Sequence, residues 1–130
     1  MQAIASGTFK VTMTPRAPGD SVAELGRFLL AKTFEGGVTG TSVGEMLSAG
    51  NPASGSAGYV ALEWVSGRIG DRSGRFVLQH AGTMDRGAQS LSITVVPGTG
   101  TEALAGLSGQ LDLVIADGEH RYTLHYQLPD

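Results

Sequence analysis

The chain has 130 residues and a mass of 13.4 kDa, which suits one domain and is too short for two. Hydrophobic residues make up 41% of the sequence, charged residues 16%, and 20 residues are glycine, a composition that excludes a disordered chain and disfavours a helical bundle. The net charge is −3, the basic residues are scattered, and there is no cysteine, so we expect no nucleic-acid partner, no anionic membrane partner and no disulfide or thiolate site.

Residues 1–10 lack the basic segment and the apolar run of a signal peptide. The sequence also contains no run of about 18 apolar residues, the length that indicates a membrane-spanning helix. We therefore expect a single cytoplasmic domain over residues 1–130, with no membrane partner.

Turn-forming residues divide the chain into eight segments of strand length. The glycine-containing breaks fall at residues 15–21, 36–37, 50–55, 70–74, 85–88, 97–109 and 117–118. This regular spacing predicts an antiparallel meander of strands. Within the long break, residues 101–105 are expected to form one helical turn, with Thr101 as its N-cap and Gly106 as its terminator.

Residues 21–34 fit two structures. Ser21 and Glu24 have the spacing of a helical capping box, but Gly26 weakens a helix. A strand places three large apolar side chains on one face, namely Phe28, Leu30 and Phe34. We favour the strand.

A turn at Gly36-Gly37 would carry the same face into the next strand. With that turn, Glu45 shares the inward face with Val43 and Leu47. Polar residues on the inward face of a small barrel are costly unless they are hydrogen-bonded, so Glu45 becomes a candidate functional residue. A link to backbone donors near the barrel mouth is an equally good interpretation of this carboxylate.

The C-terminal residues show the clearest alternation between apolar and polar positions. Asp117-Gly118 predicts a two-residue type I′ hairpin between residues 110–116 and 119–128. In that register Leu113 lies opposite Tyr122, so the apolar stripes of both strands share a face. Residues 90–95 alternate in the same way.

Eight antiparallel strands without a covering helix must bury one side of every strand, and closure into a barrel does this while removing the exposed edges. The sequence therefore predicts an all-β protein, a closed eight-stranded antiparallel meander barrel with one helical turn near residues 101–105. An eight-stranded barrel is either filled by side chains or holds one small ligand.

Several segments resemble a bacterial family known only as a domain of unknown function, whose fold is similar to the allene oxide cyclase barrel. The matching segments are ASGTF (5–9), GTSVGEMLSA (40–49), GSAGYVALE (55–63), GRFVLQHAGTM (74–84) and EALAGLSG (102–109). The resemblance covers most of the chain and implies a lipocalin-like eight-stranded barrel. It implies no established activity, and cyclase chemistry is an analogy of fold alone.

Glu63 and His80 are the strongest candidates for chemistry in the lumen. A turn at Asp71-Arg72 would pair them directly across neighbouring strands. A glutamate that holds a histidine by a hydrogen bond fixes its tautomer, which is how a general base is often built, and Tyr59 on the same face could donate to a developing oxyanion. The alternative is a structural pair that fixes the register of two strands. With only two ligands, this pair predicts no metal site and no cofactor.

Apolar and aromatic side chains are predicted to form the walls of the lumen. The candidate ligand-binding residues are Phe28, Leu30, Phe76, Leu78, Tyr122 and Tyr126. The expected function is the binding of a small, largely apolar molecule in the lumen. The alternative is a cofactor-independent isomerase or cyclase that uses a Glu63 and His80 proton shuttle, and a filled barrel that acts only through its surface is a third possibility.

The fourth and fifth strands are apolar on both faces. Their outer face carries Val60, Leu62, Trp64, Val77 and Ala81, whereas the strands around residues 91 and 124 alternate cleanly. An exposed patch of this kind indicates a subunit interface, so we expect a homo-oligomer through these two strands. Alternatively, residues 15–21 or a chain terminus cover the patch.

Overall fold

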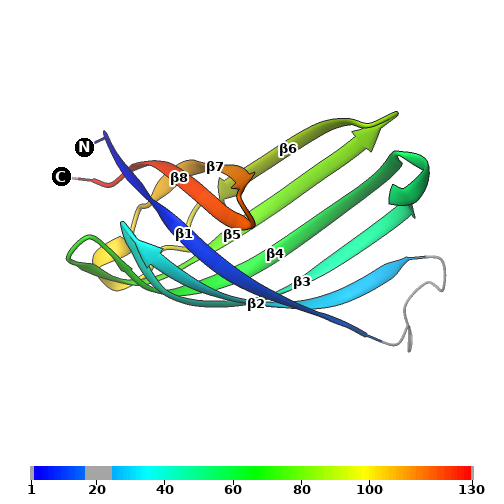
Figure 1. The fold of residues 1–130 in the computed structure, drawn as a ribbon. Coiled ribbons are helices and arrows are strands. Elements are labelled where there is room, and N and C mark those ends of the chain that lie inside the picture. The colour runs from blue at the N-terminus through cyan, green and yellow to red at the C-terminus, as the bar shows by residue number, and fades with distance from the viewer. Residues whose placement is uncertain (1, 17–24, 130) are drawn as a thin grey trace.

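The eight strands form a closed antiparallel barrel in which each strand pairs with its neighbours in sequence and the last returns to the first (Figure 1). The computed structural model describes residues 2–16 and 25–129. The elements are β1 (Gln2–Pro15), β2 (Gly26–Gly36), β3 (Val38–Asn51), η1 (Pro52–Ser54), β4 (Ser56–Ile69), β5 (Arg72–Asp85), β6 (Ala88–Val95), η2 (Glu102–Leu104), β7 (Ser108–Ala116) and β8 (Glu119–Gln127). The predicted all-β barrel is confirmed.

Helical structure in the described residues is limited to the two single turns η1 and η2. The predicted turn at residues 101–105 is confirmed as η2, although the Thr101 hydroxyl accepts a hydrogen bond from the amide of Arg75 instead of capping the turn. The strand interpretation of residues 26–34 is also confirmed, whereas Ser21 and Glu24 lie outside the described residues. No helix in the described ranges is long and apolar enough to cross a membrane.

Side chains fill the end of the barrel that holds the chain termini and η2. Leu104 of η2 is completely buried, and Leu107 and Leu128 beside it are nearly so. The Tyr122 hydroxyl accepts a hydrogen bond from the Val38 amide at 2.9 Å and donates to the Glu35 carbonyl at 2.8 Å, which fastens the β2–β3 turn to β8. The interior of the barrel at this end is therefore a packed core.

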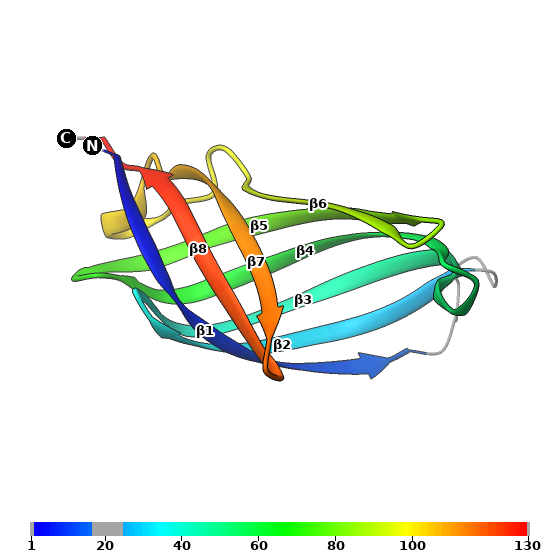
Figure 2. The same cartoon turned by 45° about the horizontal axis from the view of Figure 1, so that its top comes forward.

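The opposite end is open because β6 and β7 separate. They are joined at one residue pair, Thr94 with Gln110, and beyond it β7 runs across the barrel while β6 continues along it (Figure 2). The β7–β8 hairpin turns at Asp117 and Gly118, whose φ angles are 53° and 77°, as a type I′ turn requires. The predicted pairing of Leu113 with Tyr122 is confirmed.

The predicted inward position of Glu45 is wrong. The β2–β3 turn is centred on Gly37, so that Leu30 pairs with Gly44 and Leu29 with Glu45. This register differs by one residue from the expected one, and a one-residue shift moves every side chain of a strand to the other face. Glu45 therefore lies on the outer face, where it forms a 2.9 Å ion pair with Arg27.

The β4–β5 register also differs from the prediction, but by two residues. The turn residues are Gly70 and Asp71, so Glu63 pairs with Leu78 and His80 pairs with Ala61. Because the side-chain period of a strand is two residues, this shift leaves both side chains on the inward face. They become diagonal neighbours instead of direct partners, and they still interact.

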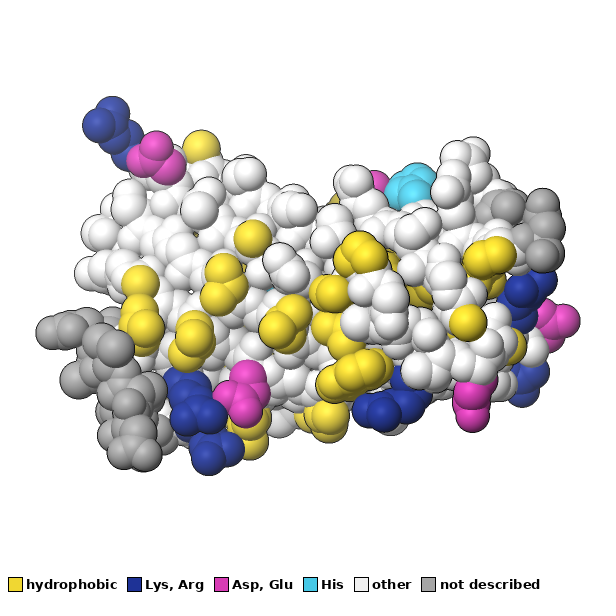
Figure 3. All heavy atoms as spheres, turned by 180° about the vertical axis from the view of Figure 1, so that it is seen from behind, with side chains coloured by type: hydrophobic (Ala, Val, Ile, Leu, Met, Phe, Trp, Pro, Cys, Tyr) yellow, Lys and Arg dark blue, Asp and Glu magenta, His cyan; other side chains and the backbone are white. Residues whose placement is uncertain are grey.

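The outer face of β4 exposes an apolar surface. Val60 and Leu62 are 55% and 54% exposed, and Trp64 is 38% exposed with the Arg75 guanidinium 4.5 Å from its ring centre. Figure 3 shows hydrophobic side chains spread across the back of the barrel between groups of charged ones. Val77, in contrast, is buried within the chain, because the segment after β6 runs beside it and bonds both of its backbone groups.

Association of copies of the chain through this outer face stays a prediction, and the buried Val77 is no longer part of the predicted interface. The alternative cover, residues 15–21, lies mostly outside the described residues.

Two valines of similar exposure provide a matched test of this association. Val60 on β4 is 55% exposed and Val114 on β7, three strands away, is 60% exposed. If β4 forms the interface, Val60→Glu should lower the assembly state measured by light scattering, because an unpaired carboxylate in a dry interface costs several kcal/mol, on the order of 3 or more. Val114→Glu should leave the assembly unchanged. A monomeric wild-type protein at high concentration would refute the interface.

Candidate functional site

A buried polar network occupies the middle of the barrel. At its centre is the carboxylate of Glu63 on β4, which has no exposed surface. Its Oε1 atom accepts a hydrogen bond from Lys32 Nζ at 2.9 Å and lies 2.7 Å from His80 Nε2. Its Oε2 atom accepts from the Ser42 hydroxyl at 2.6 Å. These partners lie on β2, β5 and β3, so one carboxylate connects four adjacent strands.

The surroundings of Glu63 decide its protonation state. Burial by itself raises the pKa of this carboxyl, but the hydrogen bond from His80, the positive charge of Lys32 and the hydrogen bond from Ser42 outweigh burial and lower the pKa from 4.5 to about 2. Glu63 is therefore ionised at neutral pH. An ionised carboxylate can only accept hydrogen bonds, so His80 Nε2 carries a hydrogen, and Nδ1 is the nitrogen that is left for a lone pair in the tautomer this contact selects.

The second nitrogen of His80 is unused. Within residues 2–16 and 25–129, Nδ1 has no hydrogen-bond partner, and it is not sealed from solvent. The tilted ring of Tyr59 lies next to this imidazole, with ring centres 6.4 Å apart. An imidazole nitrogen without a partner in the described residues therefore belongs to a ring that lies beside Tyr59.

Lys32 and Ser42 complete the network, and the sequence analysis missed both. The Lys32 ammonium lies 4.6 Å from the ring centre of Phe9, and its side chain is only 8% exposed. Lys32 lies two residues from both Leu30 and Phe34 on β2 and therefore shares their inward face. The alternation of the predicted strand could have identified it. The place of Ser42 depends on the β2–β3 register, which sequence parity does not define.

The structure brings together three of the four candidate catalytic residues. Glu63 and His80 are hydrogen-bonded, and Tyr59 is adjacent to His80 on the same inward face. Glu45, on the outer face, is separated from them by the sheet itself.

A cavity of about 480 Å³ lies at the open end of the barrel, beyond Tyr59. Its walls come from the inward faces of β1 to β7, and they include Met13, Phe28, Met46, Met84 and Leu91. Inward-facing side chains at this end remain accessible, since Met13 is 48% exposed and Leu91 is 43% exposed. The lumen is thus filled at one end and hollow at the other.

The candidate ligand-binding residues fall into different parts of the barrel. Phe28 lines the cavity. The other five do not, and four of them, Leu30, Phe76, Leu78 and Tyr122, are buried in the packed interior.

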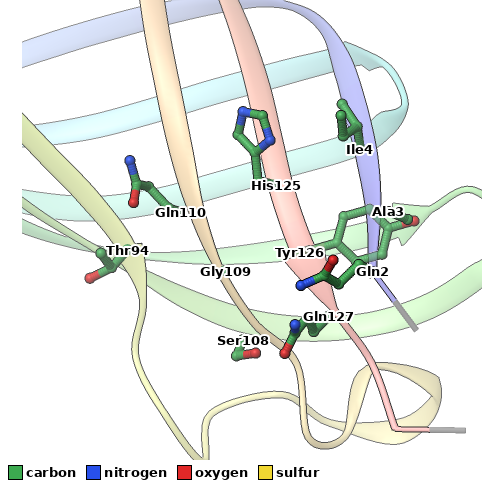
Figure 4. Close-up of a pocket in the computed structure, with 10 residues that line it drawn as sticks. All are labelled: Gln2, Ala3, Ile4, Thr94, Ser108, Gly109, Gln110, His125, Tyr126 and Gln127. Carbon is green, nitrogen blue, oxygen red and sulfur yellow. The ribbon is translucent and has the colours of Figure 1, made fainter.

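Tyr126 lines a different feature, a hollow of about 630 Å³ beside the single β6–β7 pair. Figure 4 shows its ring beside Ala3 and Gln2 of β1, and the other lining residues come from β6, β7 and β8, including Thr94 and Gln110. His125, at the rim of the hollow, is 3.1 Å from an oxygen of Asp112. The hollow has a mixed polar and apolar lining and shares no lining residue with the cavity at the open end.

The described residues contain no group of three or more histidine, aspartate or glutamate side chains that could hold a metal ion. Glu63 has one such neighbour, His80, and its remaining hydrogen bonds go to Lys32 and Ser42.

Glu63 and Glu45 allow a matched test of the buried network. A depressed carboxyl pKa stabilises the fold above the ordinary value of 4.5, and this stabilisation is lost as the pH falls towards about 2. Glu63→Gln should lower the free energy of unfolding at pH 7 by on the order of 3 kcal/mol and flatten its decline below pH 4.5.

The control is Glu45→Gln, which removes an exposed carboxylate paired with Arg27. It should cost at most about 1 kcal/mol and leave the acid decline unchanged. Urea unfolding between pH 3 and pH 7 measures both. Equal losses for the two variants would show that the buried network does not stabilise the barrel.

These features define a class of protein: a closed eight-stranded antiparallel barrel that is packed at one end, holds a charged network at its middle and opens into a cavity at the other end. The chain belongs to the family described as a protein of unknown function, DUF3224, which matches residues 5–126. The predicted resemblance to a bacterial family of unknown function is thereby confirmed.

A solved structure agrees with this assignment. It is the crystal structure of a protein with unknown function from the DUF3224 family of Shewanella oneidensis MR-1, which is 41% identical to this chain. The TM-score is 0.90, and the match covers 100% of this chain and 99% of the other. No curated protein matches the chain. The likeness to allene oxide cyclase stays a prediction.

Proposed function

We propose that this barrel binds a small, largely apolar molecule in the cavity at its open end. The observation that carries the proposal is that apolar side chains on the inward face at this end, such as Met13 and Leu91, are partly exposed. At the other end of the barrel the inward face is packed. Exposed apolar surface inside a concave site is the usual mark of a binding pocket. The volume of about 480 Å³ lies within the roughly 300–1,000 Å³ common for such sites.

The distribution of methionine supports the proposal. The sequence has four methionines, and all three in the described residues, Met13, Met46 and Met84, line this one cavity. They come from β1, β3 and β5, so they surround the space from different sides. Methionine is flexible and polarisable, and it is common at apolar surfaces that adapt to their ligands.

Adjacent residues of β3 provide a matched test. Met46 lines the cavity, whereas Leu47 lies on the outer face and is 39% exposed. The neutral fluorophore N-phenyl-1-naphthylamine should bind the wild-type protein with increased emission. Met46→Arg should weaken this binding by about tenfold or more, because it brings an unpaired charge into the apolar site, and Leu47→Arg should change it by less than about twofold.

Circular dichroism should show that both variants keep the β-sheet spectrum. Equal weakening by the two substitutions, or weakening by Leu47→Arg alone, would assign the fluorophore to the outer face and overturn the proposal. An absence of fluorophore binding by the wild-type protein would also overturn it.

A second candidate function is a cofactor-independent isomerase or cyclase. It is favoured by the Nδ1 atom of His80, which lacks a partner in the described residues while Glu63 holds Nε2. Glu63 itself, with its pKa of about 2 and three partners, is a poor base, so the proton acceptor in this function is His80 and Glu63 orients it.

The test of this second function is α-proton exchange of 2-octanone in deuterated water, followed by mass spectrometry. A base that acts on ligands in the lumen should accelerate exchange, and His80→Gln should lower the protein-catalysed exchange rate by about a hundredfold. Equal exchange rates with and without the wild-type protein would eliminate base catalysis on this ketone.

A further inference from the structure

Within residues 2–16 and 25–129, the side chains that line the cavity at the open end include no charged one. The described lining is otherwise apolar, and its polar side chains are the neutral ones of Ser48, Tyr59, Thr83, Gln89 and Ser90. A ligand that carries a charge would therefore find no counter-ion in this wall, and an unpaired charge in an apolar site is strongly disfavoured.

The nearest buried charges are already neutralised. The Lys32 ammonium is 2.9 Å from Glu63 Oε1 and rests over the Phe9 ring, and its side chain is 8% exposed. Lys32 could pair with an anionic ligand only by giving up its ion pair with the buried Glu63 carboxylate, which would then keep only its contacts with His80 and Ser42, and this loss is a large penalty. The network therefore places polar side chains in the lumen, but their charges are paired with one another and are not available to a ligand.

Tyr59 supplies a neutral hydrogen-bond donor at the inner end of the cavity. Its side chain is half-buried, it lines the cavity, and its hydroxyl has no hydrogen-bond partner in the described part of the chain. Burial and, to a lesser extent, the negative charge of Glu63 raise the pKa of the Tyr59 phenol, so the hydroxyl keeps its hydrogen at neutral pH. One acceptor atom on a ligand would satisfy it.

We propose, resting on the proposed function, that the ligand is uncharged at neutral pH and consists of an apolar skeleton with one carbonyl or hydroxyl oxygen that accepts the Tyr59 hydrogen bond. The methionine-lined wall holds the skeleton, and the phenol orients the oxygen. Carboxylates and ammonium ions of the same length are excluded because neither meets an opposite charge in the cavity.

The test compares ligands of ten carbons in competition with N-phenyl-1-naphthylamine, each below its micelle concentration. The neutral 2-decanone should displace the fluorophore, and decanoate and decylammonium should need at least about tenfold higher concentrations. Tyr59→Phe should weaken 2-decanone by about three- to tenfold, the loss of one hydrogen bond, and leave n-butylbenzene within twofold because that probe has no oxygen.

Tyr126→Phe is the matched control, since it deletes the same hydroxyl from a tyrosine that lines the surface hollow and not the cavity (Figure 4). It should change neither probe. Displacement by decanoate as effective as that by 2-decanone would overturn the inference of an uncharged ligand while leaving the apolar site in place.

Equal weakening of n-butylbenzene and 2-decanone by Tyr59→Phe would overturn the role of the phenol as donor. A wild-type protein that does not bind the fluorophore at all would instead refute the proposed function itself.

Discussion

The barrel depends on satisfying one buried carboxylate. Glu63 is ionised, has no exposed surface, and takes its three partners from three other strands: Lys32 from β2, Ser42 from β3 and His80 from β5. A shift of β3 or β5 would remove a hydrogen bond from this buried carboxylate, and a shift of β2 would remove its ion pair with Lys32, a penalty of several kcal/mol, roughly 3 to 5. Gly44 lies directly opposite Glu63, where a Cβ atom would come within 2.7 Å of the glutamate Cβ, so even the neighbouring glycine keeps space for this side chain. The network thereby favours one register across half of the barrel.

The charged network also separates two kinds of lumen. On the side of the chain termini, Leu104, Leu107 and Leu128 pack the interior as tightly as a conventional core. On the other side the strands extend beyond the short β7–β8 hairpin (Figure 2). Inward apolar side chains there, such as Met13, are partly exposed and line the cavity. Stability can therefore reside in the packed end and the network, while the open end is free to vary in shape. This division is the physical basis for proposing binding at one end of the barrel only.

Family membership places these features in a wider group without assigning an activity to it. The crystallised relative from Shewanella oneidensis shares 41% identity over essentially the whole length, and both descriptions give the function as unknown. At this identity the barrel architecture is common to both proteins, so the cavity and network described for this chain provide concrete positions at which function can be sought. In the part of the chain that the structure describes, the cavity lining carries no charge and the Tyr59 hydroxyl has no hydrogen-bond partner, and both features direct that search towards neutral ligands.

The sequence by itself determined the strands, their turns and the face of most residues, because alternation and glycine-rich breaks are local properties that one strand displays alone. It identified Glu63, His80 and Tyr59 as inward residues, and the parity of Leu30 and Phe34 was enough to include Lys32. The tertiary structure alone decided the β2–β3 and β4–β5 registers, whereas the Asp117-Gly118 turn was enough to predict the β7–β8 register. The β2–β3 turn is centred on Gly37 and not on the Gly36-Gly37 pair, and this one-residue shift moves Glu45 to the outer face. The β4–β5 turn at Gly70-Asp71 shifts the pairing by two residues, which leaves Glu63 and His80 on the inward face. Register depends on which pairing satisfies the buried charge and packs the core, and those contacts join residues far apart in the chain.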